Sequence, residues 1–333
     1  MKIGLSSIGF GALAAPEMIR TVVTNAERLN FSTVWAPEHV VLLDRYSSRY
    51  PYSADGSGQF LAPTEIPIGD PFPTLTYAAA CTSRIRLATG ICLVPEHNPL
   101  VLAKTVATVD YLSGGRVILG VGIGWLAEEF QALGIPFERR AQRTREYIGA
   151  MRRLWGDDKS SYRGEFVCFE NARSYPKPIK RDKLPVWFGG ESGPALRRVA
   201  EYGDGWFGLN VSPDEAAPKI RRIEQILSEN GRKRSELEIA VSPYPRPITV
   251  DDLKRFRDAG ADEVELLFLE APADENDVIR QLEKLAREFI EPACKLKWPQ
   301  AAIRNLTGRN PVGLIGRSPR SQSLGKVSNR FKP

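Results

Sequence analysis

The stretch from residue 99 to residue 122 reads PLVLAKTVATVDYLSGGRVILGVG and predicts a helix that is followed directly by a strand. Pro99 suits the first turn of a helix, and Ser113-Gly114-Gly115 marks the end of that helix. The run over residues 117–121 is apolar and rich in β-branched side chains, which is typical of a strand. A helix that leads through a short turn into such a strand is one step of a parallel α/β fold.

Seven further apolar runs lie before and after this stretch, and segments of helical character separate them. Repeated strand and helix pairs predict a parallel sheet covered by helices, and a closed barrel needs eight of them. The predicted fold is therefore an α/β protein of the (β/α)8 TIM barrel type. The eight strand-like runs begin near residues 2–6, 33–35, 85–91, 117–121, 185–188, 205–209, 237–241 and 263–268.

Two long connections, residues 40–73 and 156–183, are assigned to positions after the second and fourth predicted strands. The first is rich in Tyr, Ser, Gly and Pro, and the second contains an alternating segment, residues 164–169, typical of a hairpin strand. Long loops in a compact domain are uncommon unless they have a function, and the loops after barrel strands carry the site. Both connections are therefore predicted to be insertions at the active site.

The net charge of +6 comes from the end of the chain. Residues 301–333 contain seven basic and no acidic residues, so the preceding 300 residues carry 39 basic against 40 acidic side chains. Binding of nucleic acid needs a basic surface, which the barrel lacks, and a nucleic-acid partner is not expected. The tail shows no periodicity and has a composition typical of disorder. We predict a barrel domain over residues 1–295 and a basic, disordered tail over residues 296–333. The tail would be either a solvated extension or an arm that binds a partner.

The cysteines and histidines of the chain do not suggest a metal site. Four cysteines, at positions 81, 92, 168 and 294, lack the spacing of metal ligands, and there are only two histidines. The chain has no apolar run of 18 residues and begins directly with a strand pattern. We therefore expect no metal, no membrane association, reduced thiols and a cytoplasmic location.

The second predicted strand ends in Trp35-Ala36-Pro37-Glu38-His39, which places an acid and a histidine at the barrel mouth. Histidine titrates near neutral pH and often works beside a carboxylate as a proton donor or acceptor. Glu38 and His39 are therefore the predicted catalytic residues. A pair that only caps the loop is the alternative.

Glycine-rich segments follow three other strands. Gly90 would let the backbone approach a flat ligand, or would form a tight turn. The segment Gly120-Val121-Gly122-Ile123-Gly124-Trp125 has Trp125 where a dinucleotide-binding loop has its third glycine, so its glycines are expected to clear space for a ring. Gly190-Glu191-Ser192-Gly193 precedes a predicted helix whose free N–H groups suit a phosphate, although a capped helix without ligand has the same pattern.

The motifs of several common enzyme classes are missing. The sequence contains no glycine-rich loop that ends in Gly-Lys-Ser/Thr, no HExxH and no Gly-x-Ser-x-Gly. These absences argue against the corresponding phosphoryl transferases, metalloproteases and hydrolases. The protein is instead expected to bind and orient a cofactor whose ring performs hydride chemistry.

Several segments of the chain, taken in their order along the sequence, resemble the luciferase-like monooxygenase superfamily. The resemblance is to its F420-dependent oxidoreductases in particular. The resemblance covers about residues 1–290 and is most specific over residues 102–116, 120–125 and Glu128-Glu129-Phe130. Later segments that are similar to the family are Tyr175-Pro176-Lys177-Pro178, Trp187-Phe188-Gly189-Gly190 and Gly203-Asp204-Gly205-Trp206.

The resemblance implies a TIM-barrel subunit, usually a homodimer, with a cofactor ring over the carboxyl ends of the strands. It places a non-proline cis peptide bond between Gly90 and Ile91, and it matches Glu38 and His39 to an acid and a histidine near the reactive ring. The cofactor contacts that it implies or that the glycine pattern suggests are Gly90, Ile91, Gly122, Glu128, Gly190, Glu191, Ser192 and Gly193.

The sequence departs from the family at two positions. Glu96-His97-Asn98-Pro99 stands where many members have a basic residue and a histidine before proline, and His97 is the residue that would replace the cation. Trp125 stands where a sugar-phosphate-oxidising member has a glutamate, so that oxidation by the same acid is not expected.

The leading hypothesis is an oxidoreductase that transfers a hydride between the deazaflavin coenzyme F420 and a small organic substrate. The alternative is an FMN-dependent monooxygenase that uses reduced flavin and O2 on the same barrel. A third reading is a catalytically idle barrel that only binds a cofactor.

Overall fold

The computed structural model describes residues 1–53, 56–60, 62–268 and 270–296. In this part of the chain, eight parallel strands close into a barrel, because β3 pairs with both β2 and β5. A short ninth strand, β4 (Cys92–Leu93), adds to β5. The predicted (β/α)8 barrel is confirmed. In order around the barrel, the strands are β1 (Lys2–Leu5), β2 (Thr33–Ala36), β3 (Arg86–Thr89), β5 (Val117–Gly122), β8 (Val186–Gly189), β9 (Gly205–Leu209), β10 (Glu238–Ser242) and β11 (Glu263–Leu266).

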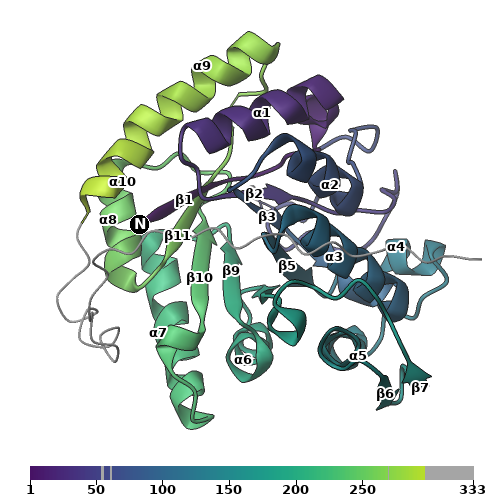
Figure 1. Cartoon of the computed structure of the whole chain (residues 1–333). Coiled ribbons are helices and arrows are strands. Elements are labelled where there is room, and N and C mark those ends of the chain that lie inside the picture. Colours follow the sequence, from purple (N-terminus) through teal and green to yellow (C-terminus); the bar gives the residue numbers. More distant parts are fainter. Residues whose placement is uncertain (54–55, 61, 269, 297–333) are drawn as a thin grey trace, which may run out of the picture. The chain divides into compact units, whose positions relative to one another are not determined.

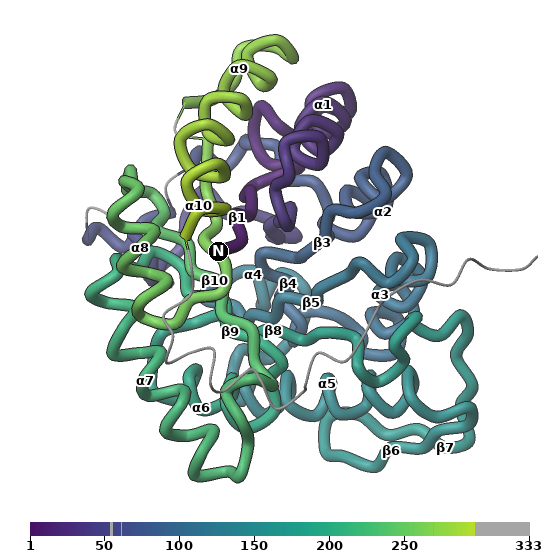
Figure 2. Tube along the Cα trace, turned by 60° about the vertical axis from the view of Figure 1, so that its left-hand side comes forward, coloured from purple at the N-terminus to yellow at the C-terminus, as the bar shows by residue number. Residues whose placement is uncertain are grey.

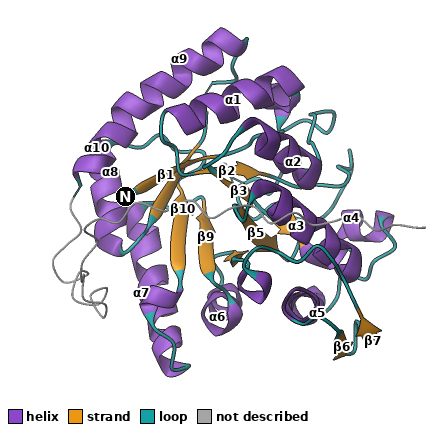
Figure 3. Cartoon of the chain, viewed as in Figure 1, coloured by secondary structure: helices purple, strands orange, loops and turns teal. Residues whose placement is uncertain are grey.

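One long helix follows each barrel strand, and the helices surround the sheet (Figures 1 and 3). The side chains between the two layers form the main apolar core. Short elements complete the described part: the helices α4 (Ala127–Ala132) and α10 (Glu291–Lys295) and a π-helical turn over Ala286–Ile290. The surrounding helices are α1 (Pro16–Arg28), α2 (Pro71–Cys81), α3 (Pro99–Ser113), α5 (Arg140–Gly156), α6 (Gly193–Tyr202), α7 (Pro213–Glu229), α8 (Val250–Ala259) and α9 (Glu275–Leu285).

Helix α3 and strand β5 form the unit predicted from residues 99–122. The Asn98 side chain accepts hydrogen bonds from the backbone of Leu100 and Val101, and Gly114 ends the helix in the left-handed conformation at φ 73°. The buried carboxylate of Asp110 then joins helix to strand, since it accepts a hydrogen bond from the Val117 N–H at 3.3 Å. Local capping thus sets both ends of α3.

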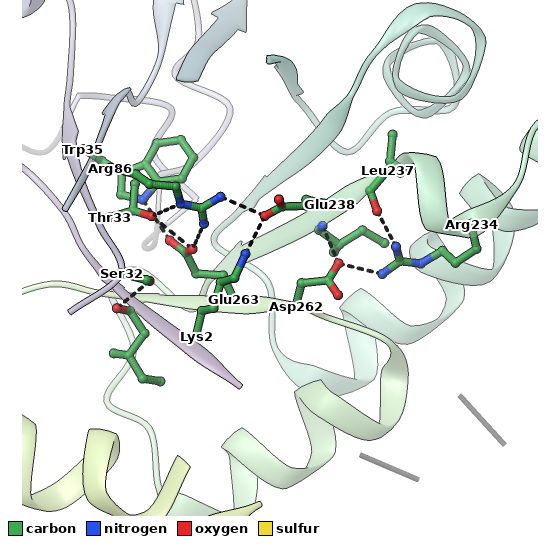
Figure 4. A network of polar contacts seen from close by, with 12 residues as sticks. Lys2, Ser32, Thr33, Trp35, Arg86, Arg234, Leu237, Glu238, Asp262 and Glu263 are labelled. Atoms are coloured by element: carbon green, nitrogen blue, oxygen red, sulfur yellow. Dashed lines mark hydrogen bonds and ion pairs between the residues drawn. The ribbon is translucent and has the colours of Figure 1, made fainter. Parts of the chain in front are cut away.

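The barrel interior is divided into an aromatic part and a charged part. Trp35, Trp187 and Phe207 pack against one another, with ring centroids 4.5 Å apart for Trp35 and Phe207. Below them Glu263 is fully buried and accepts hydrogen bonds from Arg86, Thr33 and the Trp35 indole N–H (Figure 4). The buried charge is therefore paired, as burial of a carboxylate requires.

The same arginine links three strands at the base of the barrel. Arg86 on β3 contacts Glu263 on β11 and also Glu238 on β10, at 2.9 Å. Glu238 in turn pairs with Lys2 on β1, at 2.9 Å (Figure 4). These ion pairs connect strands that lie on different sides of the barrel.

The prediction for residues 156–183 is wrong in two respects. The strands of this segment are β6 (Ser160–Arg163) and β7 (Cys168–Ala172), and most of the predicted strand over 164–169 is the turn between them. The hairpin follows helix α5 rather than a barrel strand, and it lies beside α5 on the outside of the barrel (Figure 2). An αβ connection begins at the end of the barrel opposite the mouth, so this insertion does not reach the site.

The described residues up to 296 belong to one compact unit. The predicted disorder of the basic tail concerns residues that lie outside the described ranges. None of the described helices is long and apolar enough to cross a lipid bilayer.

We predict that Arg86→Met destabilises the protein by ~3–5 kcal/mol, because it leaves the buried carboxylate of Glu263 without its cation. This loss of stability is measured as the difference in the free energy of unfolding between the variant and the wild-type protein, obtained by denaturant titration. Arg163→Met is the matched control, since Arg163 forms an exposed pair with Glu170 and its loss should change stability by less than about 1 kcal/mol. Equal effects of the two substitutions would contradict the role given to the buried pair.

Candidate functional site

A cavity of about 800 Å³ lies at the mouth of the barrel. Residues at or just after the carboxyl end of every barrel strand contribute to its wall, and so does the insertion between β2 and α2. This is the place where TIM-barrel enzymes carry their active sites. The predicted residues Glu38, His39, Gly90, Ile91, Gly122, Gly190, Glu191 and Ser192 all line the cavity, whereas Glu128 and Gly193 do not.

His39 is paired with Glu129 of α4 and not with its sequence neighbour Glu38. The His39 Nδ1 atom lies 2.8 Å from Glu129 Oε2, and both side chains are largely buried. The other carboxylate oxygen of Glu129 accepts hydrogen bonds from the backbone of Val40 and Val41, at 2.7 and 3.1 Å. Glu129 therefore holds both the imidazole and the backbone that follows it, and Nε2 is the ring nitrogen that can exchange a proton with a ligand.

Glu38 faces the other way, towards the segment that follows β3. One of its oxygens accepts a hydrogen bond from the Leu93 N–H, and the other lies 2.9 Å from His97 Nε2. Burial on its own would lower the pKa of His97, but the hydrogen bond and the charge of Glu38 raise it above its ordinary value. Glu38, which lines the cavity, and His97, which does not, thus form an ion pair at the edge of the cavity.

Glu38, Cys92 and His97 also bring three potential metal ligands within 4.8 Å of one another. Both oxygens of Glu38 already accept hydrogen bonds. Burial and the nearby Glu38 raise the pKa of the Cys92 thiol, which opposes the thiolate that a metal would need. We therefore interpret this group as an ion pair beside a structural cysteine.

A third carboxyl group, that of Glu96, is buried between Glu38 and Glu129. Neither of its oxygens has a hydrogen-bond partner among the described residues. Burial, followed by the charges of Glu129 and Glu38, raises the pKa of Glu96 to about 9. Glu96 therefore keeps its proton at neutral pH and adds no negative charge beside Glu38 and Glu129.

The floor of the cavity is built around Ile91. The peptide bond between Gly90 and Ile91 is cis, at the position that the family resemblance predicts. A Cβ atom added to Gly122 or Gly189 would lie 2.6 or 2.8 Å from Ile91 Cδ1. These glycines thus make room for a side chain of the protein, whereas we had expected Gly122 to make room for a ligand ring.

The predicted phosphate loop, residues 190–193, enters α6. Ser192 caps this helix, because its hydroxyl accepts a hydrogen bond from the Ala195 N–H. Glu191 accepts one from the Leu209 N–H at 2.9 Å and one from the Tyr52 hydroxyl, and burial raises its pKa above the ordinary value in spite of both. The Glu191 side chain therefore fastens the loop, and the helix N-terminus remains the part that suits an anion.

Two arginines that the sequence motifs did not indicate line the same side of the cavity. Arg140 donates from Nε to the Gly124 carbonyl, and Arg198 makes no hydrogen bond or ion pair among the described residues. Burial lowers the pKa of both guanidinium groups, and the charge of Arg198 lowers that of Arg140 further. Neither arginine has an acidic partner in the described ranges, so this side of the cavity suits an anion such as a phosphate.

Glu128 holds the insertion that follows β2. Its carboxylate accepts hydrogen bonds from the backbone and hydroxyl of Ser47, at 2.6 and 2.9 Å, and from the backbone of Ser48. Although burial opposes this, the hydrogen bonds lower the pKa of Glu128 to about 2. Glu128 lies outside the residues that line the cavity, since its Oε1 is held by the insertion, whereas its buried Oε2 has no hydrogen-bond partner among the described residues. Its contact with the cofactor ring stays a prediction.

The insertion places aromatic rings over the cavity. Tyr50 and Phe60 pack edge to face at 5.2 Å, and both lie close to Trp125, which follows β5. His39 contacts the rings of Phe60 and Trp125 at 5.5 and 5.9 Å. The candidate proton donor thus borders an aromatic wall.

Comparisons of the sequence with known proteins identify similar chains. Residues 5–262 match the family model described as luciferase-like monooxygenase. An uncharacterized protein of Mycobacterium tuberculosis is 35% identical over 268 residues, which are 79% of this chain and 91% of that protein. An FMNH(2)-dependent dimethylsulfone monooxygenase of Pseudomonas fluorescens is 29% identical over 168 residues, which are 50% of this chain and 44% of that protein.

Solved structures share the fold. The coenzyme F420-dependent tetrahydromethanopterin reductase of Methanopyrus kandleri superposes with a TM-score of 0.67 at 19% identity, over 87% of this chain and 98% of that one. The family model covers far more than half of the chain, from the last residue of β1 to the residue before β11. The chain belongs to the luciferase-like monooxygenase family.

Proposed function

We propose that this oxidoreductase transfers a hydride between coenzyme F420 and a small organic substrate. The single observation that carries the proposal is the cavity, which combines the His39–Glu129 pair on one wall with two unpaired arginines on another. A deazaflavin supplies hydride transfer when bound. The residue resemblance to F420-dependent members of the family supports this cofactor.

The chain's own groups fit such a cofactor. Arg140 and Arg198 are half-buried cations without acidic partners in the described ranges, and a phosphate group would satisfy both. Ser192 and the first turn of α6 would add backbone donors beside them. The Ile91 side chain would support the ring from below, since it lines the cavity floor.

His39 would provide or accept the proton that accompanies hydride transfer. Glu129 occupies Nδ1, so the exchange takes place at Nε2. The remaining site carboxylates are engaged or neutral, since Glu38 pairs with His97 and Glu96 keeps its proton. His39 is therefore the proposed general acid or base, and Glu129 is a positioning residue.

FMN is the alternative cofactor, because the Pseudomonas fluorescens relative is described as FMNH(2)-dependent. Its phosphate would use the same arginines. Oxygen uptake with reduced FMN would favour the monooxygenase reaction, since a reduced deazaflavin reacts poorly with O2.

We also propose a homodimer. Helix α3 exposes apolar side chains at both ends, and more lie on α2 and before β8. Soluble monomers seldom expose a large contiguous apolar surface. The most exposed members are Val101, Leu112, Tyr111 and Ile179.

Titration by calorimetry should show that the protein binds F420 and that Arg198→Met weakens binding by about 10- to 100-fold, the loss expected for one charge-assisted hydrogen bond. Arg197→Met is the matched control, because Arg197 lies exposed on the same helix outside the cavity. Binding of FMN but not of F420 would contradict the cofactor assignment.

His39→Ala should lower the rate of hydride transfer by about 10²-fold or more, since it removes the proton donor, while the Kd for the cofactor stays within about threefold. Glu129→Gln should lower the rate by a smaller factor, because the imidazole remains but loses its charged partner. Single-turnover oxidation of the reduced deazaflavin with a panel of ketones measures both. Unchanged rates in His39→Ala would contradict the role given to His39, and no turnover by the wild-type protein would support the idle barrel.

Sedimentation velocity should give the mass of a dimer for the wild-type protein. The double variant Val101→Glu and Leu112→Glu should have the mass of a monomer, because two charges at an apolar interface lack partners. A wild-type monomer at micromolar concentration would refute the dimer.

A further inference from the structure

Two adjacent hydroxyl groups line the cavity on the side of β1. Ser6 and Ser7 follow this strand directly, and their Oγ atoms lie 3.1 Å apart. Consecutive residues of an extended chain point to opposite sides. Ser7 departs from this pattern, because its backbone is left-handed, at φ 65°, which is unfavourable for a residue other than glycine. The turn at Ser7 thus brings two neighbouring hydroxyl groups together.

A buried carboxyl group lies behind these hydroxyls. Glu265 on β11 is 1% exposed and does not line the cavity. Its backbone is in register with Gly4 of β1, two residues before Ser6. The hydroxyl groups of Ser6 and Ser242 lie beside its carboxyl group, yet neither of its oxygens has a well-formed hydrogen bond among the described residues. A buried polar group without such partners is unfavourable and rare, which makes a functional role a reasonable expectation.

No cation forms an ion pair with Glu265 in the described part of the barrel. The other acid of its strand, Glu263, is paired with Arg86. The charged residues of the two neighbouring strands, Lys2 on β1 and Glu238 on β10, pair with each other at the base (Figure 4). Burial raises the pKa of Glu265 to about 7, although the two serine hydroxyls oppose the rise and the charge of Glu263 adds to it. Glu265 therefore gains or loses its proton close to neutral pH.

Ser6 connects Glu265 to the cavity. Its hydroxyl group lies beside the carboxyl group and also 3.1 Å from the Ser7 Oγ atom. A hydroxyl group can donate one hydrogen bond and accept another at the same time. The three side chains thus form a row of proton donors and acceptors that leads from the barrel interior to the cavity. Ser242 lies beside the same carboxyl group but is buried and does not line the cavity.

We infer that Glu265 exchanges a proton with a molecule bound in the cavity through the hydroxyl groups of Ser6 and Ser7. The role of this second proton route in the reaction rests on the proposed function, because hydride transfer is accompanied by one proton at the cofactor and one at the substrate. His39 serves one of these two protons, and the route on the β1 side serves the other.

Each step of the route moves one proton and leaves the electron pair of the broken bond behind. When the bound molecule loses a proton, Ser7 Oγ accepts it and Ser7 gives its own hydrogen to Ser6 Oγ. Ser6 then gives its hydrogen to the carboxylate of Glu265, which becomes neutral. Both serines end with one hydrogen on oxygen, as they began. The reverse sequence protonates the bound molecule and leaves Glu265 with a negative charge.

Infrared spectroscopy of the full-length protein without ligand tests the proton on Glu265. The C=O stretching band of a protonated carboxyl group is separate from that of a carboxylate, so the difference between the wild-type protein and Glu265→Gln isolates this residue. The band should be present at about pH 6 and lost at about pH 8, since the pKa of Glu265 is raised to about 7. Glutamine has the same shape, and denaturant titration checks that the variant is folded.

Deuterium exchange tests the route itself. After mixing with D2O, the Glu265 band of the wild-type protein should shift as the carboxyl proton exchanges with solvent in the cavity. Ser6→Ala should slow this shift by about tenfold or more, because alanine cannot pass on a proton. Ser242→Ala is the matched control, since Ser242 lies beside the same carboxyl group outside the cavity wall, and it should leave the exchange rate unchanged.

Single-turnover measurements with reduced F420 test the role in the reaction. Glu265→Gln and Ser6→Ala should each lower the rate of hydride transfer by about tenfold or more, whereas the Kd for the cofactor should stay within about threefold. The Glu265→Gln variant should also lose the part of the pH dependence of this rate that titrates near the pKa of Glu265. Ser242→Ala should keep both the rate and its pH profile.

The outcomes separate this inference from the proposed function. Absence of a carboxylic acid band that Glu265→Gln removes, or equal deuterium exchange in Ser6→Ala and Ser242→Ala, would overturn the proton route. Unchanged single-turnover rates in Glu265→Gln would overturn its part in the reaction. If F420 does not bind but Ser6→Ala alone slows the exchange, the cofactor assignment fails and the route from Glu265 to the cavity stands.

Discussion

A closed barrel of eight strands must fill its own interior, and the way in which this chain does so determines where a ligand can bind. At one end the carboxylate of Glu263 is buried with Arg86, Thr33 and the Trp35 indole as partners. Bulky rings, among them Trp187, occupy the middle. Because buried side chains fill the base and the middle, the cavity described above lies at the mouth, where every strand delivers its carboxyl end.

The sequence was sufficient to predict the barrel and the elements that bear the site, because strand periodicity, helix caps and motif order are local properties. It was not sufficient to predict the pairing of the acids. Consecutive residues of an extended segment point to opposite sides, so Glu38 and His39 diverge, although their adjacency suggested a pair. His39 meets Glu129, which lies 90 residues away along the chain. No local spacing contains such a contact, and the same holds for Arg140 and Arg198.

The hairpin after α5 and the acid Glu128 show the limits of position as evidence. A long connection suggests a functional loop, but it lies at the mouth of the barrel only if it follows a strand. The connection that contains β6 and β7 follows a helix. Glu128 lies one residue before Glu129, yet it serves the insertion through Ser47 and Ser48. Two neighbouring acids of α4 therefore do different work, since one holds the imidazole and the other holds the insertion that borders it.

Ile91 has a consequence for the evolution and engineering of this barrel. Its side chain fills the volume that the missing Cβ atoms of Gly122 and Gly189 leave free, so the segment after β3 shares one space with β5 and β8. A larger residue at either glycine requires the end of the Ile91 side chain to shift or residue 91 to become smaller. Libraries that vary the cavity floor one position at a time would therefore miss the floors that need both changes, whereas joint variation of the three positions would sample them.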